Sequence, residues 1–148
     1  MRSQCLAKSF VFKDFVEGFE YILPSFEITR KMVDSFAKLS GDYSPIHMDG
    51  SFSKKKGFEG RVVHGVFFAT ILSKIVGMDF PGKNALLQSI SLTFIEPAYI
   101  GDKIEVQTKV FQVSHSTSTI VLKSTISNIK TGNLICRAKI QVGITEDE

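Results

Sequence analysis

Two side chains that can move protons lie five positions apart in the stretch SGDYSPIHMDG, residues 40–50: Asp42 and His47. A carboxylate and an imidazole that hold one water between them form a general acid/base pair. Pro45 excludes a regular helix through the segment and pushes Ser44 toward an extended conformation, so we expect an irregular loop that can turn both side chains toward one point. Aspartate and serine are also common turn residues, and His47 can be purely structural, so the spacing alone leaves both interpretations open.

A glycine at the start of a strongly apolar segment is the second candidate. Gly65 follows RVVH and precedes VFFATILSKIV, which we expect to form a helix. The free N–H groups and the positive dipole end of a helix N-terminus stabilise negative charge, and a glycine lets a ligand come close to the backbone. Gly65 can therefore be an oxyanion donor for a carbonyl oxygen that gains negative charge, although a glycine that simply starts the helix explains it as well. We assign His64 to the pocket wall or to a structural role rather than to catalysis.

The other histidine, the lysine cluster and the cysteines give little support for other chemistries. His115 lies at an expected hairpin turn and should face solvent, and the run 54–56 should be a solvated lysine cluster. Cys5 and Cys136 have no metal-type spacing; Cys136 lies in a strand-like run and should be a small buried residue, so reduced thiols are expected. The sequence has no GxSxG, P-loop or GxGxxG motif, which leaves covalent catalysis and nucleotide hydrolysis without support.

A strand and a helix must precede the acid/base loop. Residues 18–28 have strand composition, and Pro24 within them indicates an edge position or a bulge. Thr29 is a good N-cap for the helix that follows, and Gly41 is placed to end it. The buried face of this helix should consist of the residues that recur at helical spacing: Met32, Val33, Phe36 and Ala37.

Four strands should follow the apolar helix. The helix is expected over 64–77 with Gly77 as its end, and it is apolar almost all round from residue 66 to residue 76, which places it in the centre of the domain. The strand-like runs have short connections, so we expect antiparallel neighbours. A sheet that curls around one apolar helix buries both, which predicts an α+β domain with the helix as its filling. The four runs are residues 86–95, 103–113, 119–128 and 134–143.

The chain has the size and composition of one globular domain. Its 148 residues can bury one core, and 43% hydrophobic against 22% charged residues is ordinary for a globular protein. A net charge of +3 falls far short of a nucleic-acid footprint. No apolar run reaches the length of a signal peptide or a membrane span, so we expect a cytoplasmic protein with neither membrane nor nucleic-acid partners. We place the domain at 17–145 and leave 1–16 as an N-terminal extension of uncertain structure.

Three motifs in order resemble the MaoC-like dehydratase family, which includes the R-specific enoyl-CoA hydratases. SGDYSPIHMD is similar to the family pattern S/T-G-D-x-N-P-x-H-x-D, VVHG to its V-H-G, and LTFIEPAYIGDKIEV (92–106) to its F-x-x-P-v-x-x-G-D segment. The ordered set is more specific than any one motif, and the resemblance covers about residues 17–143. It implies the hot-dog fold, a curved antiparallel sheet around a long helix, and a homodimer or higher homo-oligomer whose sheets join.

The resemblance also implies a reaction. The family's lyases reversibly add water, in the syn sense, to a trans-2-enoyl thioester and give the (R)-3-hydroxyacyl product. By motif position Asp42 and His47 would be the catalytic pair and Gly65 N–H the oxyanion donor, with Ser44 and His64 at the substrate site. The resemblance implies neither a metal nor a redox cofactor, and it makes the acyl carrier, coenzyme A or acyl carrier protein, part of the substrate.

One position departs from the family pattern. Ser44 stands where the family has Asn; it still donates and accepts a hydrogen bond but is shorter, so loop geometry or water placement should differ. Two alternatives to a hydratase stay open: a hot-dog acyl-CoA thioesterase that uses the same groove, and a non-catalytic acyl-thioester-binding domain. His47 argues against the thioesterase, whereas Ser44 is what makes the binding domain conceivable.

Overall fold

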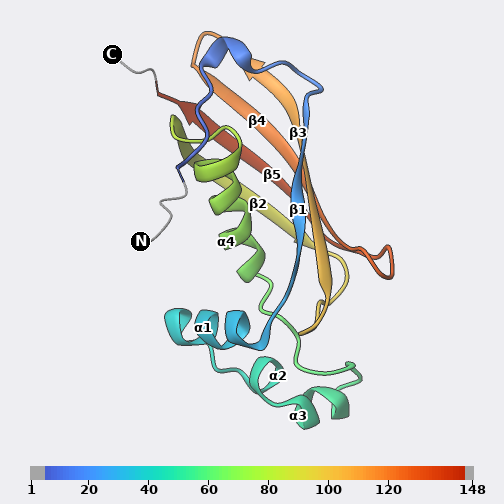
Figure 1. Cartoon of the computed structure of the whole chain (residues 1–148). Coiled ribbons are helices and arrows are strands. Elements are labelled where there is room, and N and C mark those ends of the chain that lie inside the picture. Colours follow the sequence, from blue (N-terminus) through green and yellow to red (C-terminus); the bar gives the residue numbers. More distant parts are fainter. Residues whose placement is uncertain (1–5, 146–148) are drawn as a thin grey trace.

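Five antiparallel strands form one sheet that curves around a helix in the computed structural model (Figure 1), which describes residues 6–145. Along the sheet the strands follow the order β1-β3-β4-β5-β2, so β1 and β2 are its edges. The predicted α+β hot-dog arrangement is confirmed. The strands are β1 (Glu20–Glu27), β2 (Ala85–Phe94), β3 (Lys103–Ser114), β4 (Thr119–Asn128) and β5 (Leu134–Ile144).

Two of the three predicted strand pairings between chain neighbours are present. β3 pairs with β4 and β4 pairs with β5, as the short connections predicted. The prediction is wrong for β2 and β3, because residues 95–102 carry the chain from one edge of the sheet to the opposite side, and β2 pairs with β5 instead. Pro24 lies on edge strand β1, inside a register shift between Leu23 and Phe26, as expected for an edge or bulge proline.

The core lies between the concave face of the sheet and helix α4 (Phe67–Lys74), which Figure 1 shows against that face. Alternate residues of the central strands, such as Val106 and Leu122, are buried there. On the helix, Phe68 and Leu72 are buried, but Val66 just before it is 61% exposed. Central burial of the apolar helix is therefore confirmed for one face only, because the other face lies open in the single chain.

The chain stays helical beyond Gly77. A π-helical turn, η2 (Ile75–Asp79), continues α4, and the helix ends at Phe80. The prediction that Gly77 ends the helix is wrong: a glycine stops a helix by adopting a left-handed conformation, and Gly77 has no positive φ. The extra turn brings the buried Phe80 ring to the end of the domain, where the N-terminal residues pack.

Residues 6–16 cover that end of the domain. A short 3-10 turn, η1 (Phe12–Asp14), lies in this segment, and Ser9 forms a single antiparallel bridge with Gly82. The rings of Phe10 and Phe15 pack against Phe80 with centroids 5.4 and 5.6 Å apart. The part of the N-terminal extension that is described is thus an aromatic cover, while Cys5 and the acidic end at 146–148 lie outside the described residues.

Three helices lie beyond the N-terminal end of α4, on the opposite side from residues 6–16 (Figure 1). They are α1 (Arg30–Ser40), α2 (Pro45–Met48) and α3 (Gly50–Lys55). Thr29 caps α1 by accepting a hydrogen bond from Met32 N, and Gly41 ends it at a φ of 76°, as predicted. Val33 and Ala37 are buried, but the predicted buried face is wrong at Met32, which is 36% exposed.

Candidate active site

The loop after α1 holds Asp42 by local hydrogen bonds. Asp42 N–H donates to Ser40 Oγ at 3.2 Å, and the Asp42 carboxylate accepts from Ser44 N–H at 3.1 Å. Ser44 is extended (φ −50°, ψ 134°), as predicted for a residue before proline. The expected irregular loop is wrong for 45–48, because Pro45 starts the one-turn helix α2 from its first position, where a helix needs no N–H. Ser44 Oγ makes no hydrogen bond within the described residues.

His47 presents one ring nitrogen to Asp42. Its Nδ1 lies 2.7 Å from Val62 O, and because a carbonyl only accepts, Nδ1 carries the hydrogen and Nε2 is left unprotonated in the neutral ring. Nε2 lies 3.9 Å from Asp42 Oδ2. The His47 side chain is 16% exposed and that of Asp42 50% exposed, so the pair is reachable from outside. The structure thus brings the two predicted acid/base residues to one point.

His64 belongs to the same cluster. Its side chain is buried, and its ring stacks on that of His47 with centroids 3.9 Å apart. Its Nε2 donates to Asp42 O at 2.9 Å and lies 4.0 Å from Asp42 Oδ2. Its Nδ1 is buried and has no hydrogen-bond partner. His64 therefore holds the Asp42 main chain in place and packs against the His47 ring.

The spacing within the cluster fits a shared water. Two polar atoms 3.9 Å apart can both contact one water at about 2.8 Å, which puts a water between Asp42 Oδ2 and His47 Nε2 within reach of both. The ligating atoms of Asp42, His47 and His64 all lie within 4.8 Å of one another, a group that a metal could also use. Tetrahedral zinc ligands stand about 3.3 Å apart, closer than the 3.9 and 4.0 Å found here, and His64 Nε2 already donates to Asp42 O, so the arrangement suits water better than a metal.

Gly65 lies in the turn that leads into α4. Its carbonyl accepts from Phe68 N–H at 3.1 Å, while the N–H groups of Gly65 and Val66 donate no hydrogen bond within the described residues. Free N–H groups at this helix start are what an oxyanion site requires. A side chain on Gly65 would begin 2.9 Å from the ring of Phe94, so packing gives a second reason for glycine here.

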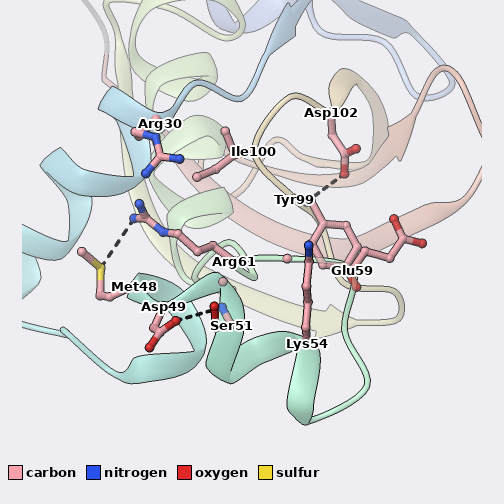
Figure 2. Close-up of a pocket in the computed structure, with 12 residues that line it drawn as sticks. Arg30, Met48, Asp49, Ser51, Lys54, Glu59, Arg61, Tyr99, Ile100 and Asp102 are labelled. Carbon is pink, nitrogen blue, oxygen red and sulfur yellow. Dashed lines mark hydrogen bonds between the residues drawn. The ribbon is translucent and has the colours of Figure 1, made fainter.

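Arg61 and Asp34 are the residues near this site that the sequence analysis missed. The Arg61 side chain is 9% exposed, pairs with Asp34 at 2.5 Å and donates to His47 O at 2.6 Å. It lines a pocket of about 920 Å³ beside the His47 turn (Figure 2), together with Arg30 and Lys54. The only sequence feature that could have indicated Arg61 is its position between Gly60 and an apolar run, but a sequence does not show that such a charge is buried.

Residues set aside in the sequence are placed as expected. His115 is exposed at the β3–β4 turn, and the lysines at 54–56 are exposed. Cys136 is a fully buried free thiol in β5, where burial raises its pKa to about 11 and keeps it protonated. None of these residues adds a group to the cluster around Asp42.

The family model described as "MaoC like domain" matches residues 18–131. The chain belongs to the MaoC-like domain family. One relative of this MaoC-like protein is an (R)-specific enoyl-CoA hydratase from Aeromonas caviae, which is 36% identical over 53% of this chain and 58% of that protein. Another is a 3-hydroxybutyryl-CoA dehydratase from Methylorubrum extorquens, which is 35% identical over 69% of this chain and 64% of that protein. In these alignments the chain therefore covers less than two thirds of either relative.

Solved structures place the MaoC-like chain in the hot-dog fold. The (R)-hydratase of A. caviae superposes with a TM-score of 0.83 at 27% identity, over 89% of this chain and 98% of that one. An R-hydratase from Pseudomonas aeruginosa superposes with a TM-score of 0.84 over 92% of this chain and 86% of that one. Its sequence identity is 20%, so this likeness shows the fold alone. Every helix within residues 6–145 is too short or too polar to span a bilayer.

Proposed function

We propose that the protein catalyses reversible syn hydration of a trans-2-enoyl thioester to the (R)-3-hydroxyacyl thioester. The observation that carries this proposal is the 3.9 Å gap between Asp42 Oδ2 and His47 Nε2, which accommodates one water. The free N–H groups of Gly65 and Val66, next to His64 in the chain, supply donors for a carbonyl oxygen. The family and its hydratase- and dehydratase-named relatives support the reaction type.

The step balances with these residues alone. The oxygen of the held water bonds to C3 of the enoyl group, and the basic member of the pair takes one of its protons. The C2–C3 double bond opens toward the thioester carbonyl, whose oxygen gains negative charge beside the Gly65 N–H. The pair then delivers this same proton to C2 on the face that the water attacked, which restores the starting protonation of the pair, so no external reagent is needed. The base and acid roles therefore belong to Asp42 and His47 together, because the two side chains hold the water between them.

The proposed reaction includes no reactant beyond water and the acyl thioester. The carrier, coenzyme A or acyl carrier protein, is part of the substrate, so the proposal includes no separate cofactor. The fully buried free thiol of Cys136 suits a reducing compartment such as the cytoplasm, which we propose as the location.

We also propose that two copies of the chain form a homodimer through edge strand β2. Edge strand β2 pairs on one side with β5, and its other side is available for pairing. Large apolar side chains at both ends of this strand are exposed: Leu86 by 60% and Phe94 by 51%. Two copies of β2 in antiparallel register would continue the sheet from one subunit into the next and cover this apolar surface.

The test is an assay that separates hydration from thioester cleavage. We expect loss of the enoyl-thioester absorbance with crotonyl-CoA or a longer trans-2-enoyl-CoA, without release of free thiol. A panel that varies chain length and carrier identifies the substrate. Thiol release without hydration would indicate the thioesterase, and tight acyl-CoA binding without turnover across the panel would indicate the binding domain; either outcome would overturn the proposal.

A further inference from the structure

We infer that Arg61 is a positioning residue that sets the place of the His47 ring, an inference that rests on the hydration proposed above. The guanidinium of Arg61 bonds the main chain of the one-turn helix that carries His47 and ties this helix to α1. It does not reach the proposed water site through any contact of its own, so it acts through His47.

Helix α2 leaves most of its carbonyl groups to donors outside the helix. A helix leaves its last C=O groups without intrahelical partners, and in this four-residue helix Pro45 O accepts from the N–H of the C-cap residue Asp49 at 2.8 Å. Ile46 O accepts from Val62 N–H at 3.0 Å and from Ser53 Oγ at 2.6 Å. His47 O accepts from Arg61 Nε at 2.6 Å, its only hydrogen bond within the described residues. Arg61 therefore supplies the one hydrogen bond that the His47 carbonyl accepts within the described residues.

The guanidinium is itself held firmly. Its side chain is 9% exposed, and Nη2 pairs with Asp34 Oδ1 of α1 at 2.5 Å. A charged group that is so little exposed to solvent requires such a partner, because burying an unpaired charge costs on the order of several kcal/mol. Figure 2 shows the side chain directed at Met48, whose sulfur lies 3.6 Å from Nη2. Arg61 thus spans from α1 to the end of α2 with little freedom to move.

Residues 61 and 62 hold His47 from outside α2, in addition to the bond inside the helix from His47 N–H to Ser44 O at 2.9 Å. Arg61 binds the His47 carbonyl, and the next residue, Val62, accepts from the His47 ring through its carbonyl at 2.7 Å. Loss of the Arg61 bond would leave the His47 carbonyl without a donor at the end of α2 and would let Nε2 shift relative to Asp42 Oδ2. A displacement of about 1 Å at reacting groups can lower a rate by about 100-fold.

Lysine cannot replace arginine at this position. A guanidinium is a planar fork that can bond a carbonyl through Nε and a carboxylate through Nη at once, whereas an ammonium is a single point. A matched control lies in the same pocket: Arg30 also lines it (Figure 2) but makes no hydrogen bond to 45–48 within the described residues. The same Arg-to-Lys change at the two positions therefore separates the contact with His47 from charge and pocket shape.

The experiment compares Arg61→Lys and Arg30→Lys by steady-state kinetics and by ¹⁵N NMR of the histidine rings. For Arg61→Lys we expect kcat to fall about 10- to 100-fold with KM changed less than about threefold, and the exchange-protected Nδ1–H signal of His47 to be lost. Arg30→Lys should keep kcat within about twofold and keep the signal. Asp34→Asn, which leaves the Nε–His47 bond in place, should have a smaller effect than Arg61→Lys. Arg61→Gln is the second variant should Arg61→Lys fail to fold.

Two outcomes would overturn the inference. One is a folded Arg61→Lys protein with an unchanged kcat and an unchanged His47 signal; the other is an equal loss in Arg30→Lys. If the wild-type protein hydrates no enoyl thioester, the proposed function fails, yet the His47 signal still decides whether Arg61 positions the ring. The failure of one proposal can thus be told from the failure of the other.

Discussion

The ring of Phe94, at the end of edge strand β2, lies 2.9 Å from the point where a side chain on Gly65 would begin. The two residues come from segments almost thirty positions apart, and their contact gives Gly65 two reasons to be glycine. One is close approach of a thioester to the backbone N–H; the other is room for the Phe94 ring. Phe94 is 51% exposed, so its ring has space to swing aside, which makes the two reasons separable by experiment.

Gly65→Ala should lower kcat/KM by about 10-fold or more, because a methyl group beside the N–H would crowd the thioester where the oxyanion forms. Phe94→Leu removes the ring contact and should by itself change kcat/KM less than about threefold. We predict that Gly65→Ala stays impaired in the double variant with Phe94→Leu. Recovery of activity in the double variant would instead mean that the glycine serves only the packing of Phe94.

Ser44→Asn should be tolerated. Ser44 is exposed and extended, and its hydroxyl makes no hydrogen bond within the described residues, so a longer amide meets no packed neighbour. We expect the melting temperature to change little and kcat to stay within about threefold, because surface changes of this kind alter stability by about 0.5 kcal/mol or less. Thermal melts and steady-state rates check this. A large gain in rate would contradict this and show that serine in place of the family's asparagine limits the proposed hydration.

Alkaline pH should destabilise the wild-type protein through Cys136. Burial raises its pKa from 9.0 to about 11 in the folded state, so the folded protein holds a proton that the unfolded chain gives up at lower pH. Stability is therefore unaffected below pH 9 and falls as pH rises from 9 toward 11. At about 1.4 kcal/mol per pKa unit, the loss amounts to roughly 2–3 kcal/mol. Urea unfolding of the wild type and Cys136→Ala over this range should show the extra loss only in the wild type.

The chain should be a dimer in solution if β2 edges pair. Light scattering should give about twice the chain mass of 16.5 kDa. Leu86→Lys places a charge on the exposed apolar side of the β2 edge and should shift the mass toward the monomer at micromolar concentration. A wild-type protein that is monomeric at the same concentration would contradict the pairing.

Sequence reasoning predicted the elements whose signals are local. The run 119–128 matches β4 at both ends, and the helix between Thr29 and Gly41 has the cap and stop that its residues indicated. The pairing of β2 with β5 was not predicted, because it depends on the path of the connection 95–102 across the sheet, which no local sequence pattern indicates. The helix end at Gly77 was missed because a glycine stops a helix only in a left-handed conformation, and Phe80 continues the burial beyond it.

The candidate site also contains residues that the sequence predicts and residues that only the structure reveals. Asp42, His47 and Gly65 could be named from motif order, because these residue types carry their own chemistry. The stacking of His64 on His47 and the burial of Arg61 could not, because each depends on two segments meeting in space. Arginine in a sequence is expected at the surface, so only the structure makes this one part of the site.

The catalytic roles of Asp42 and His47 can be tested by the hydration rates of the wild type, Asp42→Asn, His47→Asn and the double variant on the best enoyl thioester. General acid/base groups contribute about 100- to 10,000-fold each, and a pair that works through one water should fail as a unit. We predict that each single variant loses at least about 100-fold in kcat and that the double variant is scarcely slower. Hydration that survives both single substitutions would contradict the assignment of Asp42 and His47 as the catalytic pair.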